Sequence, residues 1–397
     1  MYSIKTLYKI GNGPSSSHTM GPRNAVLYVL EHYPNADLYQ MYVYESLALT
    51  GVGHLLDYIV EKTFGDIPHK VVFDMETKCK HPNTMVFKVH KDNKVEEITI
   101  YSVGGGLIDV EGVEDEGYVD VYPHKIFDEV KSYCLENNIS LPDYVKKYEP
   151  EGLKEHMEKV YKTMRNMVDE GLEKNGHLPG KLHVSRKAKK ILNKVSPHER
   201  ADMREKRLIS AYAFAASEEN ACGSTVVTAP TCGACGIMPA LLKYYEEQGF
   251  SHEQLIDGLL VAGIIGLVVK HNASISGAEC GCQAEVGTAC SMGAAFVAHL
   301  YSQDVEVIER AAEIAMEHTL GLTCDPIDGY VQIPCIERNA LGALRAIDSA
   351  MITHLINTTD SKISFDTVVQ TMYQTGKDLH NSYRETSTGG LAKTYKR

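Results

Sequence analysis

The sequence lacks three features that would direct a protein to secretion, to a membrane or to nucleic acid. Its first residues, Met1 to Lys5, do not have the charged and then apolar layout of a secretory signal. The longest apolar run, Leu255 to Val269, contains Asp257 and is too short to span a bilayer, so it predicts a buried helix. There is no dense basic block, and 40 Lys and Arg stand against 52 Asp and Glu. We therefore expect a cytoplasmic protein with a small-molecule partner, and neither a nucleic-acid nor a membrane partner.

Internal repeats and low-complexity tracts are also lacking, and the length of 397 residues favours two domains. The first part alternates between helical patterns and strand patterns. Beyond an acidic, Gly-rich stretch at residues 109–125, helical periodicity dominates. We predict an α+β protein with an N-terminal α/β domain over residues 1–120 and an all-helical domain over residues 121–397. The expected strands are Asp37–Glu45, Val71–Phe73, Met85–Val89 and Glu97–Val103, and the clearest expected helices are Lys125–Asn137, Glu151–Lys174, Arg186–Val195, Leu255–Val269 and Cys290–Leu300.

A serine-rich loop precedes the first expected helix. It contains Ser15, Ser16, Ser17 and His18, and Pro22 suits the first turn of the helix that follows. Hydroxyls and free backbone N–H groups at a helix N-terminus can hold an anion such as a carboxylate. A plain N-cap without a ligand explains the local pattern equally well. The presence of His18 favours a functional loop.

A second histidine follows the Gly51-Val52-Gly53 turn, where we expect another helix to begin. His54 and Asp57 would then lie on neighbouring turns of one face. A single histidine at a helix start is more often a cap or a surface group. Two Gly-flanked histidines at loop-to-helix junctions of one small domain make a site shared by His18 and His54 more plausible.

Two further loops stand out in the first part. One is His81-Pro82-Asn83-Thr84, and the other is Ser102-Val103 followed by Gly104-Gly105-Gly106. A triple glycine after a strand permits close backbone approach to a ligand or to another domain, although a simple bulge is the commoner reason. The triplet is not a dinucleotide-binding fingerprint, because no helix with the required glycine spacing follows.

The ten cysteines are the chain's most informative residue type. In a reducing compartment they are either buried small groups or metal ligands. The pair Cys232 and Cys235 has neither the second pair of a zinc site nor the strand of a thioredoxin motif, which favours packing among small residues. Five more fall between Asn272 and Asn339, among Gly, Pro and small polar residues. They are Cys280, Cys282, Cys290, Cys324 and Cys335. Of these, Cys282, Cys324 and Cys335 are candidate iron–sulfur ligands, but spacing alone leaves a metal site and buried thiols equally open.

Several long motifs, in a fixed order along the chain, give more specific evidence than the spacing of the cysteines. They are Gly13–Thr19, Ser46–Leu47 with Thr50–His54, Tyr101–Gly106, Val226–Thr231, Asn272–Glu279, Gly281–Gly287, Leu320–Pro326, Ile333–Asn339, and Glu385–Thr386 with Gly389–Ala392. Together they resemble the iron–sulfur-dependent L-serine dehydratases, or L-serine ammonia-lyases, along nearly all of the chain.

The resemblance implies a lyase that converts L-serine to pyruvate and ammonia, as in amino-acid degradation and gluconeogenesis. It implies a [4Fe–4S] cluster on Cys282, Cys324 and Cys335 that acts as a Lewis acid, with the other seven cysteines non-ligating. The N-terminal domain would be similar to the allosteric substrate-binding domain of some phosphoglycerate dehydrogenases, fused here to the helical cluster-binding domain. A homodimer is the common case for such an enzyme.

The resemblance also implies roles for individual residues. His54 would take the Cα proton, with His18 as a second catalytic residue. The expected substrate-binding residues are Ser15, Ser16, Ser17, Thr19, Asn83, Ser102, Gly104 and Gly105. Relatives often end in a cysteine that can occupy the fourth iron position. Residues 393–397 of this chain contain no sulfur, so we expect water or another small ligand there.

Three other interpretations compete with this one. A pyridoxal-phosphate dehydratase would need a Schiff-base lysine beside a Gly-rich phosphate loop, and the sequence has no such pairing. A non-catalytic iron–sulfur sensor could bind amino acids through residues 1–120. A dehydratase could also act on another small 3-hydroxy or 3-thiol amino acid.

Overall fold

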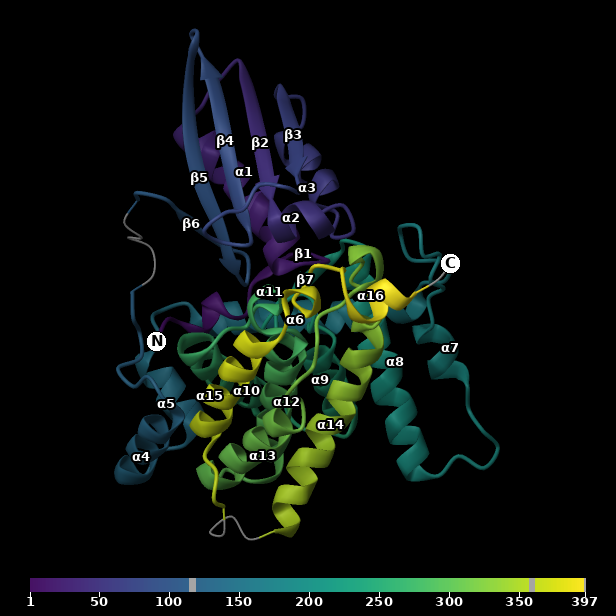
Figure 1. Ribbon diagram of the computed structural model, residues 1–397. Coiled ribbons are helices and arrows are strands. Elements are labelled where there is room, and N and C mark those ends of the chain that lie inside the picture. The colour runs from purple at the N-terminus through teal and green to yellow at the C-terminus, as the bar shows by residue number, and fades with distance from the viewer. Residues whose placement is uncertain (114–118, 357–360, 396–397) are drawn as a thin grey trace.

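The computed structural model describes residues 1–113, 119–356 and 361–395. A sheet with helices on one side stands on a larger body of helices, as Figure 1 shows. The predicted α+β class is confirmed, with the small sheet in the N-terminal part and a helical C-terminal part. The expectation for residues 114–118 of the acidic linker lies outside the described residues.

Five strands form the N-terminal sheet in the order β3-β2-β4-β5-β6. β2 and β3 pair in parallel, and the other neighbours pair antiparallel. Each of the four predicted strands is present, with its bounds shifted by a few residues. The strands are β2 (Leu38–Tyr44), β3 (His69–Asp74), β4 (Thr84–Lys91), β5 (Lys94–Gly104) and β6 (Leu107–Val110).

One face of this sheet carries the core of the N-terminal part. Tyr39, Met41 and Val43 alternate along β2 as buried residues, which is the period of a half-buried strand. They pack in one hydrophobic cluster with Val26 of α1 (Gly21–His32) and Val60 of α3 (Leu56–Phe64). The short helix α2 (Glu45–Thr50) follows β2 directly. The helices therefore cover a single face, and the loops at the lower end of the sheet point towards the helical body (Figure 1).

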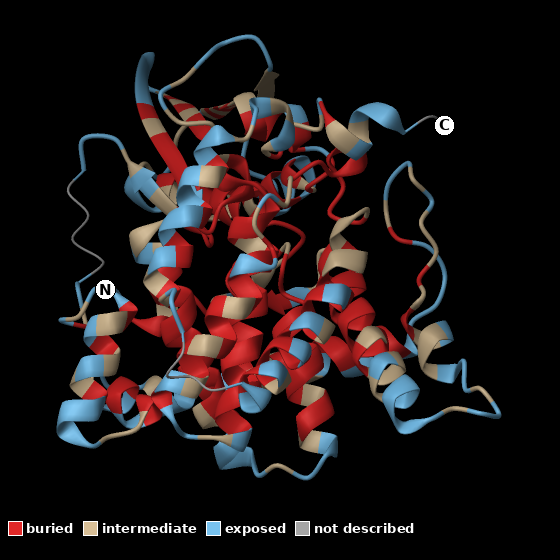
Figure 2. Cartoon of the chain, turned by 60° about the horizontal axis from the view of Figure 1, so that its bottom comes forward, coloured by how far each residue is buried: buried red, intermediate tan, exposed pale blue. Residues whose placement is uncertain are grey.

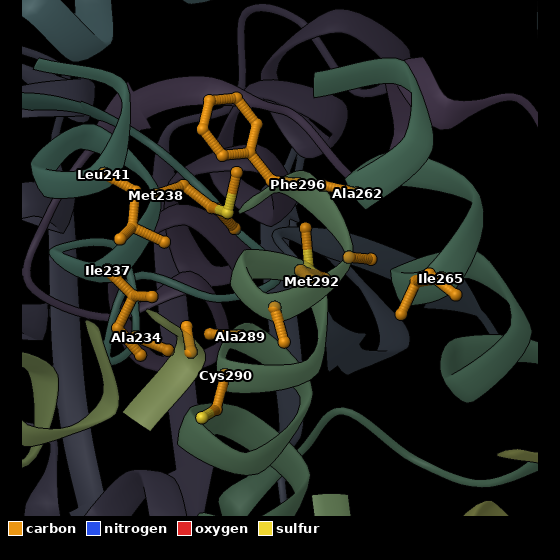
Figure 3. Close-up of a cluster of buried hydrophobic side chains, with 14 of the residues drawn as sticks. Ala234, Ile237, Met238, Leu241, Ala262, Ile265, Ala289, Cys290, Met292 and Phe296 are labelled. Carbon is orange, nitrogen blue, oxygen red and sulfur yellow. The ribbon is translucent and has the colours of Figure 1, made fainter. Parts of the chain in front are cut away.

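The helical body is built around α12 (Thr288–Tyr301), which packs against α9, α10, α13 and α14. Phe296 and Met292 of α12 lie with Met238 of α9 in a buried cluster (Figure 3). Figure 2 shows the buried residues concentrated in these central helices. The other helices and turns of the body are α4 (Phe127–Asn137), α5 (Leu141–Tyr148), α6 (Leu153–Glu173), α7 (Ala188–Asn193), α8 (Ala201–Ala221), α9 (Ile237–Glu247), α10 (His252–Asn272), α11 (Gly277–Cys280), η3 (Gln283–Gly287), α13 (Val305–Glu317), η4 (Ile327–Gly329), α14 (Cys335–Leu355), α15 (Phe365–Asp378), η6 (Asn381–Tyr383) and α16 (Gly390–Thr394).

The apolar run around Leu255–Val269 forms α10, which extends beyond the run at both ends to 21 residues. By length and composition, it is the one helix among the described residues that could cross a membrane. The prediction of a buried helix is confirmed, because 72% of its most apolar stretch is buried within the fold. A capping box at Ser251 and Gln254 fixes where it begins.

The first twelve residues do not belong to the sheet of the N-terminal part. Met1, Ile4 and Tyr8 are buried in the core of the helical body. β1 (Ile10–Asn12) then pairs antiparallel with β7 (Thr225–Val227). The expectation of an all-helical second part is therefore wrong at β7, where a strand of three residues receives the N-terminal segment. The domain boundary at residue 120 stays a prediction.

Candidate active site

Three thiols from distant parts of the helical body line one cavity. They belong to Cys282, Cys324 and Cys335, which are the three candidate iron–sulfur ligands. Cys282 and Cys324 are buried, and Cys335 is partly buried. The fold thus brings together the cysteines that the sequence spreads over more than fifty residues.

Local structure explains how each thiol reaches the cavity. Cys282 caps the N-terminus of η3, and Cys335 is the first residue of α14. Free N–H groups and the helix dipole at such ends favour thiolates. Cys324 lies in an extended segment that forms a parallel bridge with Arg384. All three side chains therefore come from the ends of elements or from the connections between them.

The burial of these thiols favours their neutral form. Burial raises the pKa of Cys324 and of Cys335 well above its usual value, and the other cavity cysteines and acids add to that shift. Burial also raises the pKa of Cys282, which Arg338 partly offsets through a hydrogen bond to the sulfur. A bound cation would reverse this balance, because metal coordination deprotonates a thiol. Arg338 would then lie beside three thiolates whose charge it helps to neutralise.

The three thiols share their cavity with Glu285 and Arg338. Gly277 keeps space open beside them, since a Cβ there would lie 3.0 Å from Cys324 Sγ and 2.8 Å from Glu285 Oε2. The donor set of three thiols fits an iron–sulfur cluster on these cysteines.

The N-terminal part contributes two histidines to the same place. His18 lies in η2 (Ser16–Met20), the π-helical turn before α1, and His54 lies in the turn between α2 and α3. Their rings stack with centroids 4.5 Å apart, and both side chains are buried. The structure thus brings the two histidines together, and a site that they share stays a prediction. The expected helix start near Gly53 is wrong, because Leu55 has a left-handed backbone with φ 57° and the helix begins at Leu56.

Hydrogen bonds assign a tautomer to each ring. His54 Nδ1 lies 2.9 Å from the Thr50 carbonyl and donates to it, so Nε2 carries the lone pair. Ser46 Oγ donates to the Glu385 carbonyl, so it accepts from His18 Nε2 at 3.0 Å and leaves the lone pair on Nδ1. Burial lowers the pKa of His54 to about 4, and it lowers the pKa of His18 well below the usual value. Both rings are therefore neutral near pH 7.

A carboxyl group from the far end of the chain meets both lone pairs. Glu385 Oε1 lies 3.5 Å from His54 Nε2 and 3.8 Å from His18 Nδ1. Burial, and then the nearby Glu285, raise the pKa of Glu385 well above its usual value, so this carboxyl holds its proton to a higher pH than an ordinary glutamic acid does. Its backbone has φ 56°, a left-handed conformation that costs energy for a residue with a side chain. Strain of this kind is typical of functional positions.

Backbone hydrogen bonds connect Glu385, which lies in the C-terminal tail (residues 379–395), to the loop that carries Cys324. Glu385 N donates to the Cys324 carbonyl at 2.8 Å, and Cys324 N donates to the Tyr383 carbonyl at 2.7 Å. Farther along the tail, Leu391 N donates to Asp325 at 2.7 Å, and Asp325 pairs with Arg338 at 3.4 Å. The tail therefore connects the two histidines of the N-terminal part to the cysteine loops of the helical body.

The expected substrate-binding residues fall into two groups. Ser15 lines the cavity, and its Oγ accepts from the backbone of His18 at 3.0 Å. Thr19 lies behind it and donates to the His54 carbonyl at 2.7 Å. The others do not line the cavity. Ser16 and Ser17 are buried in η2, Ser102 donates to the Ser17 carbonyl at 2.8 Å, Asn83 faces Ser102, and Gly104 and Gly105 form the turn at the β5–β6 junction. Thr19 does not line the cavity either, and a direct contact of all eight residues with substrate stays a prediction.

Four other cysteines of the helical body lie outside the cavity and pack in its core. Cys290 belongs to the hydrophobic cluster of α12 (Figure 3), and Cys280 packs against Gly376 of α15. Cys232 and Cys235 are fully buried in the main core, as expected for packing among small residues. These four thiols therefore have the surroundings of core groups.

Sequence reasoning assigned no role to three charged residues of the site. Glu285, Arg338 and Glu385 line the cavity with the cysteines and His54. All three belong to the long motifs, so those motifs could have identified them as residues of the site. No local pattern distinguishes them from surface charges, because their burial depends on contacts between segments far apart in the chain.

Comparison with known proteins supports the family resemblance that the motifs indicate, over the whole length of the chain. Residues 3–65 match the family described as serine dehydratase beta chain, and residues 74–392 match the family described as serine dehydratase alpha chain. The chain is 39% identical to the L-serine dehydratase of Haemophilus influenzae, over 99% of each protein. It is also 39% identical to L-serine dehydratase 2 of Escherichia coli, over 99% of this chain and 98% of that protein. The L-serine dehydratase of Helicobacter pylori strain 26695 is 39% identical over 100% of this chain. The two family matches meet within the sheet, near β3, whereas the sheet itself continues to Val110.

Proposed function

Because the chain belongs to the serine dehydratase family and joins its beta and alpha parts in one lyase polypeptide, we propose that it converts L-serine to pyruvate and ammonia with a [4Fe–4S] cluster. The observation that carries the proposal is the composition of one cavity. Three thiols from the helical body face His54 and Glu385 there. Each half of the chain thus supplies part of the site, as a single-chain enzyme of this family would need.

Cys282, Cys324 and Cys335 would hold the cluster. Bound by three thiolates, such a cluster keeps one iron open and supplies Lewis acidity to the hydroxyl and carboxylate of the substrate. Arg338 supports the thiolates through its hydrogen bond to Cys282. Its guanidinium is fixed from the other side by Asp325, so it cannot turn away from the sulfurs without losing that partner.

His54 is the proposed base. Its Nε2 carries the lone pair, and its other nitrogen is held by the Thr50 carbonyl. The ring is therefore oriented and neutral before substrate arrives, which is the state that a base must have to accept the Cα proton. The Glu385 carboxyl lies beside this lone pair, 3.5 Å from His54 Nε2. Ser15 and His18 would position the substrate carboxylate or ammonium.

The atoms of the reaction balance without a further reactant. Loss of the Cα proton and of the hydroxyl group removes one water molecule and leaves aminoacrylate. Its imine tautomer takes the water back and releases ammonia, so L-serine yields one pyruvate and one ammonia. No oxidant or reductant is consumed.

We also propose a cytoplasmic enzyme that acts as a homodimer. A reducing compartment is supported by the ten cysteines, none of which forms a disulfide. The dimer is supported by the general preference of soluble oligomers for two-fold symmetry. Sedimentation of the loaded enzyme would test it.

The test is anaerobic purification followed by measurement of iron, sulfide and pyruvate released from L-serine. We expect about four iron atoms per chain and pyruvate formation in the same fraction. Pyruvate without iron would refute the cluster and favour a pyridoxal-phosphate type of reaction. Iron without pyruvate would refute the enzyme and favour an amino-acid sensor, unless threonine or cysteine is consumed instead, which would correct the substrate alone.

A further inference from the structure

A second group of metal-ligand type lies beside the cysteines but contains no sulfur. His18, His54 and Glu385 each offer one ligand atom, and these atoms lie within 4.8 Å of one another. The side chains are 0%, 1% and 7% exposed. His18 Nδ1 and Glu385 Oε2 are buried, and neither has a hydrogen-bond partner among the described residues. Buried polar atoms without partners are costly, so their presence calls for a ligand.

The two imidazoles are oriented as metal ligands are. A metal-bound histidine donates its other N–H to a carbonyl, a carboxylate or water, which fixes the tautomer and the ring. His54 does this through Nδ1 to Thr50, and His18 does it through Nε2 to Ser46. Both lone pairs then point to the same carboxyl oxygen. The outer hydrogen bonds of a metal site are therefore already in place.

The distances also suit a small ion. Tetrahedral zinc with bonds of about 2.0–2.1 Å holds its nitrogen and oxygen ligands roughly 3.4 Å apart. Glu385 Oε1 lies 3.5 Å from His54 Nε2 and 3.8 Å from His18 Nδ1. The two histidine nitrogens lie within 4.8 Å of each other, so they would have to approach by at most roughly 1.4 Å to reach this geometry. The cavity that His54 and Glu385 line offers a fourth position.

We propose that His18, His54 and Glu385 bind one zinc-type divalent cation, and that this ion inhibits the enzyme reversibly. Two nitrogens and one oxygen select a borderline cation over Mg²⁺ or Ca²⁺, which prefer oxygen ligands, and Zn²⁺ binds such sites more tightly than Fe²⁺ or Mn²⁺ does. The inhibition rests on the proposed function, because the ion would occupy the His54 Nε2 lone pair that takes the Cα proton. The binding itself does not rest on it.

Binding is tested in the full chain with Zn²⁺ as the probe. The cluster-loaded enzyme is treated anaerobically with Zn²⁺, desalted and analysed for zinc per chain. Glu385→Gln removes one ligand with little change of shape, and we expect it to retain one zinc ion fewer than wild type. Ser46→Ala keeps all three ligands and removes the partner of His18 together with the hydrogen bond to the Glu385 carbonyl, so we expect affinity to fall about 10- to 100-fold. His32→Gln, on the exposed end of α1, should retain as much zinc as wild type.

A spectroscopic measurement separates this site from the thiols. The variant C282S/C324S/C335S cannot hold zinc or cobalt on the cluster ligands. Co²⁺ added to it should give visible bands of nitrogen and oxygen coordination without sulfur charge transfer, and Glu385→Gln in the same chain should abolish them. Equal zinc content in wild type and Glu385→Gln, or absent cobalt bands, would overturn the site.

Inhibition is tested separately. Zn²⁺ should stop pyruvate release while cluster absorbance stays constant, and EDTA should restore the rate. Zinc bound without loss of activity would overturn the inhibitory role. Failure of the zinc-free, cluster-loaded enzyme to release pyruvate would instead count against the proposed function. The number of zinc ions bound per chain would still test the metal site.

Discussion

His54 should remain an effective base at pH values where an ordinary histidine is protonated. Burial lowers its pKa to about 4, and the hydrogen bond to Thr50 offsets only part of that shift. At pH 5 a group with this pKa is about 90% neutral, whereas a histidine at the usual 6.5 is about 3% neutral. Between pH 7 and pH 5, the supply of neutral base should therefore fall by about a tenth, instead of about 25-fold.

The measurement is kcat/KM for pyruvate release across this pH range, because that ratio reports the ionisation of the free enzyme. Serine itself keeps its ammonium and carboxylate forms throughout. Glu285 is the cavity group that complicates the profile, since burial raises its pKa to about 7. The same profile is therefore measured in Glu285→Gln, where that carboxyl no longer titrates.

We expect kcat/KM of Glu285→Gln to change less than about twofold between pH 7 and pH 5. Rates are expressed per cluster, so that loss of iron in acid is not counted as loss of base. A fall of about 25-fold with a midpoint near 6.5, seen in both proteins with cluster absorbance unchanged, would refute a buried neutral His54 as the base.

Three substitutions test the other parts of the site. Cys324→Ala should lose the cluster, whereas Cys232→Ala in the core should keep it; retained iron in the first variant would refute the ligand set. Glu385→Gln should keep the iron and lower kcat about 10- to 100-fold, because both imidazoles lose their acidic partner; an unchanged kcat would remove it from the mechanism. Arg338→Gln should weaken cluster retention about 10- to 100-fold during gel filtration, and equal iron content in this variant and in Arg345→Gln, a half-exposed control on the same helix, would contradict the role of the guanidinium.

Parts of this fold follow from local sequence alone. Tyr39, Met41 and Val43 alternate with less buried residues, so β2 is readable from its period of two. The run around Leu255–Val269 is apolar on all sides, which indicates a fully buried helix whatever its neighbours are. The predicted elements were wrong where the backbone does not follow the local sequence pattern. Leu55 takes a left-handed conformation that delays α3, and β7 exists only because β1 pairs with it from the other end of the chain.

The site shows the same division. The sequence by itself determined the residue types, the long motifs and hence the family, because these are properties of the order of residues. Only the tertiary structure decided that Glu385 stands between His18 and His54, and that Cys290 packs in the core while Cys335 faces the cavity. The physical reason is that pKa, tautomer and ligand geometry depend on burial and on contacts between segments hundreds of residues apart, and these exist only after the chain has folded.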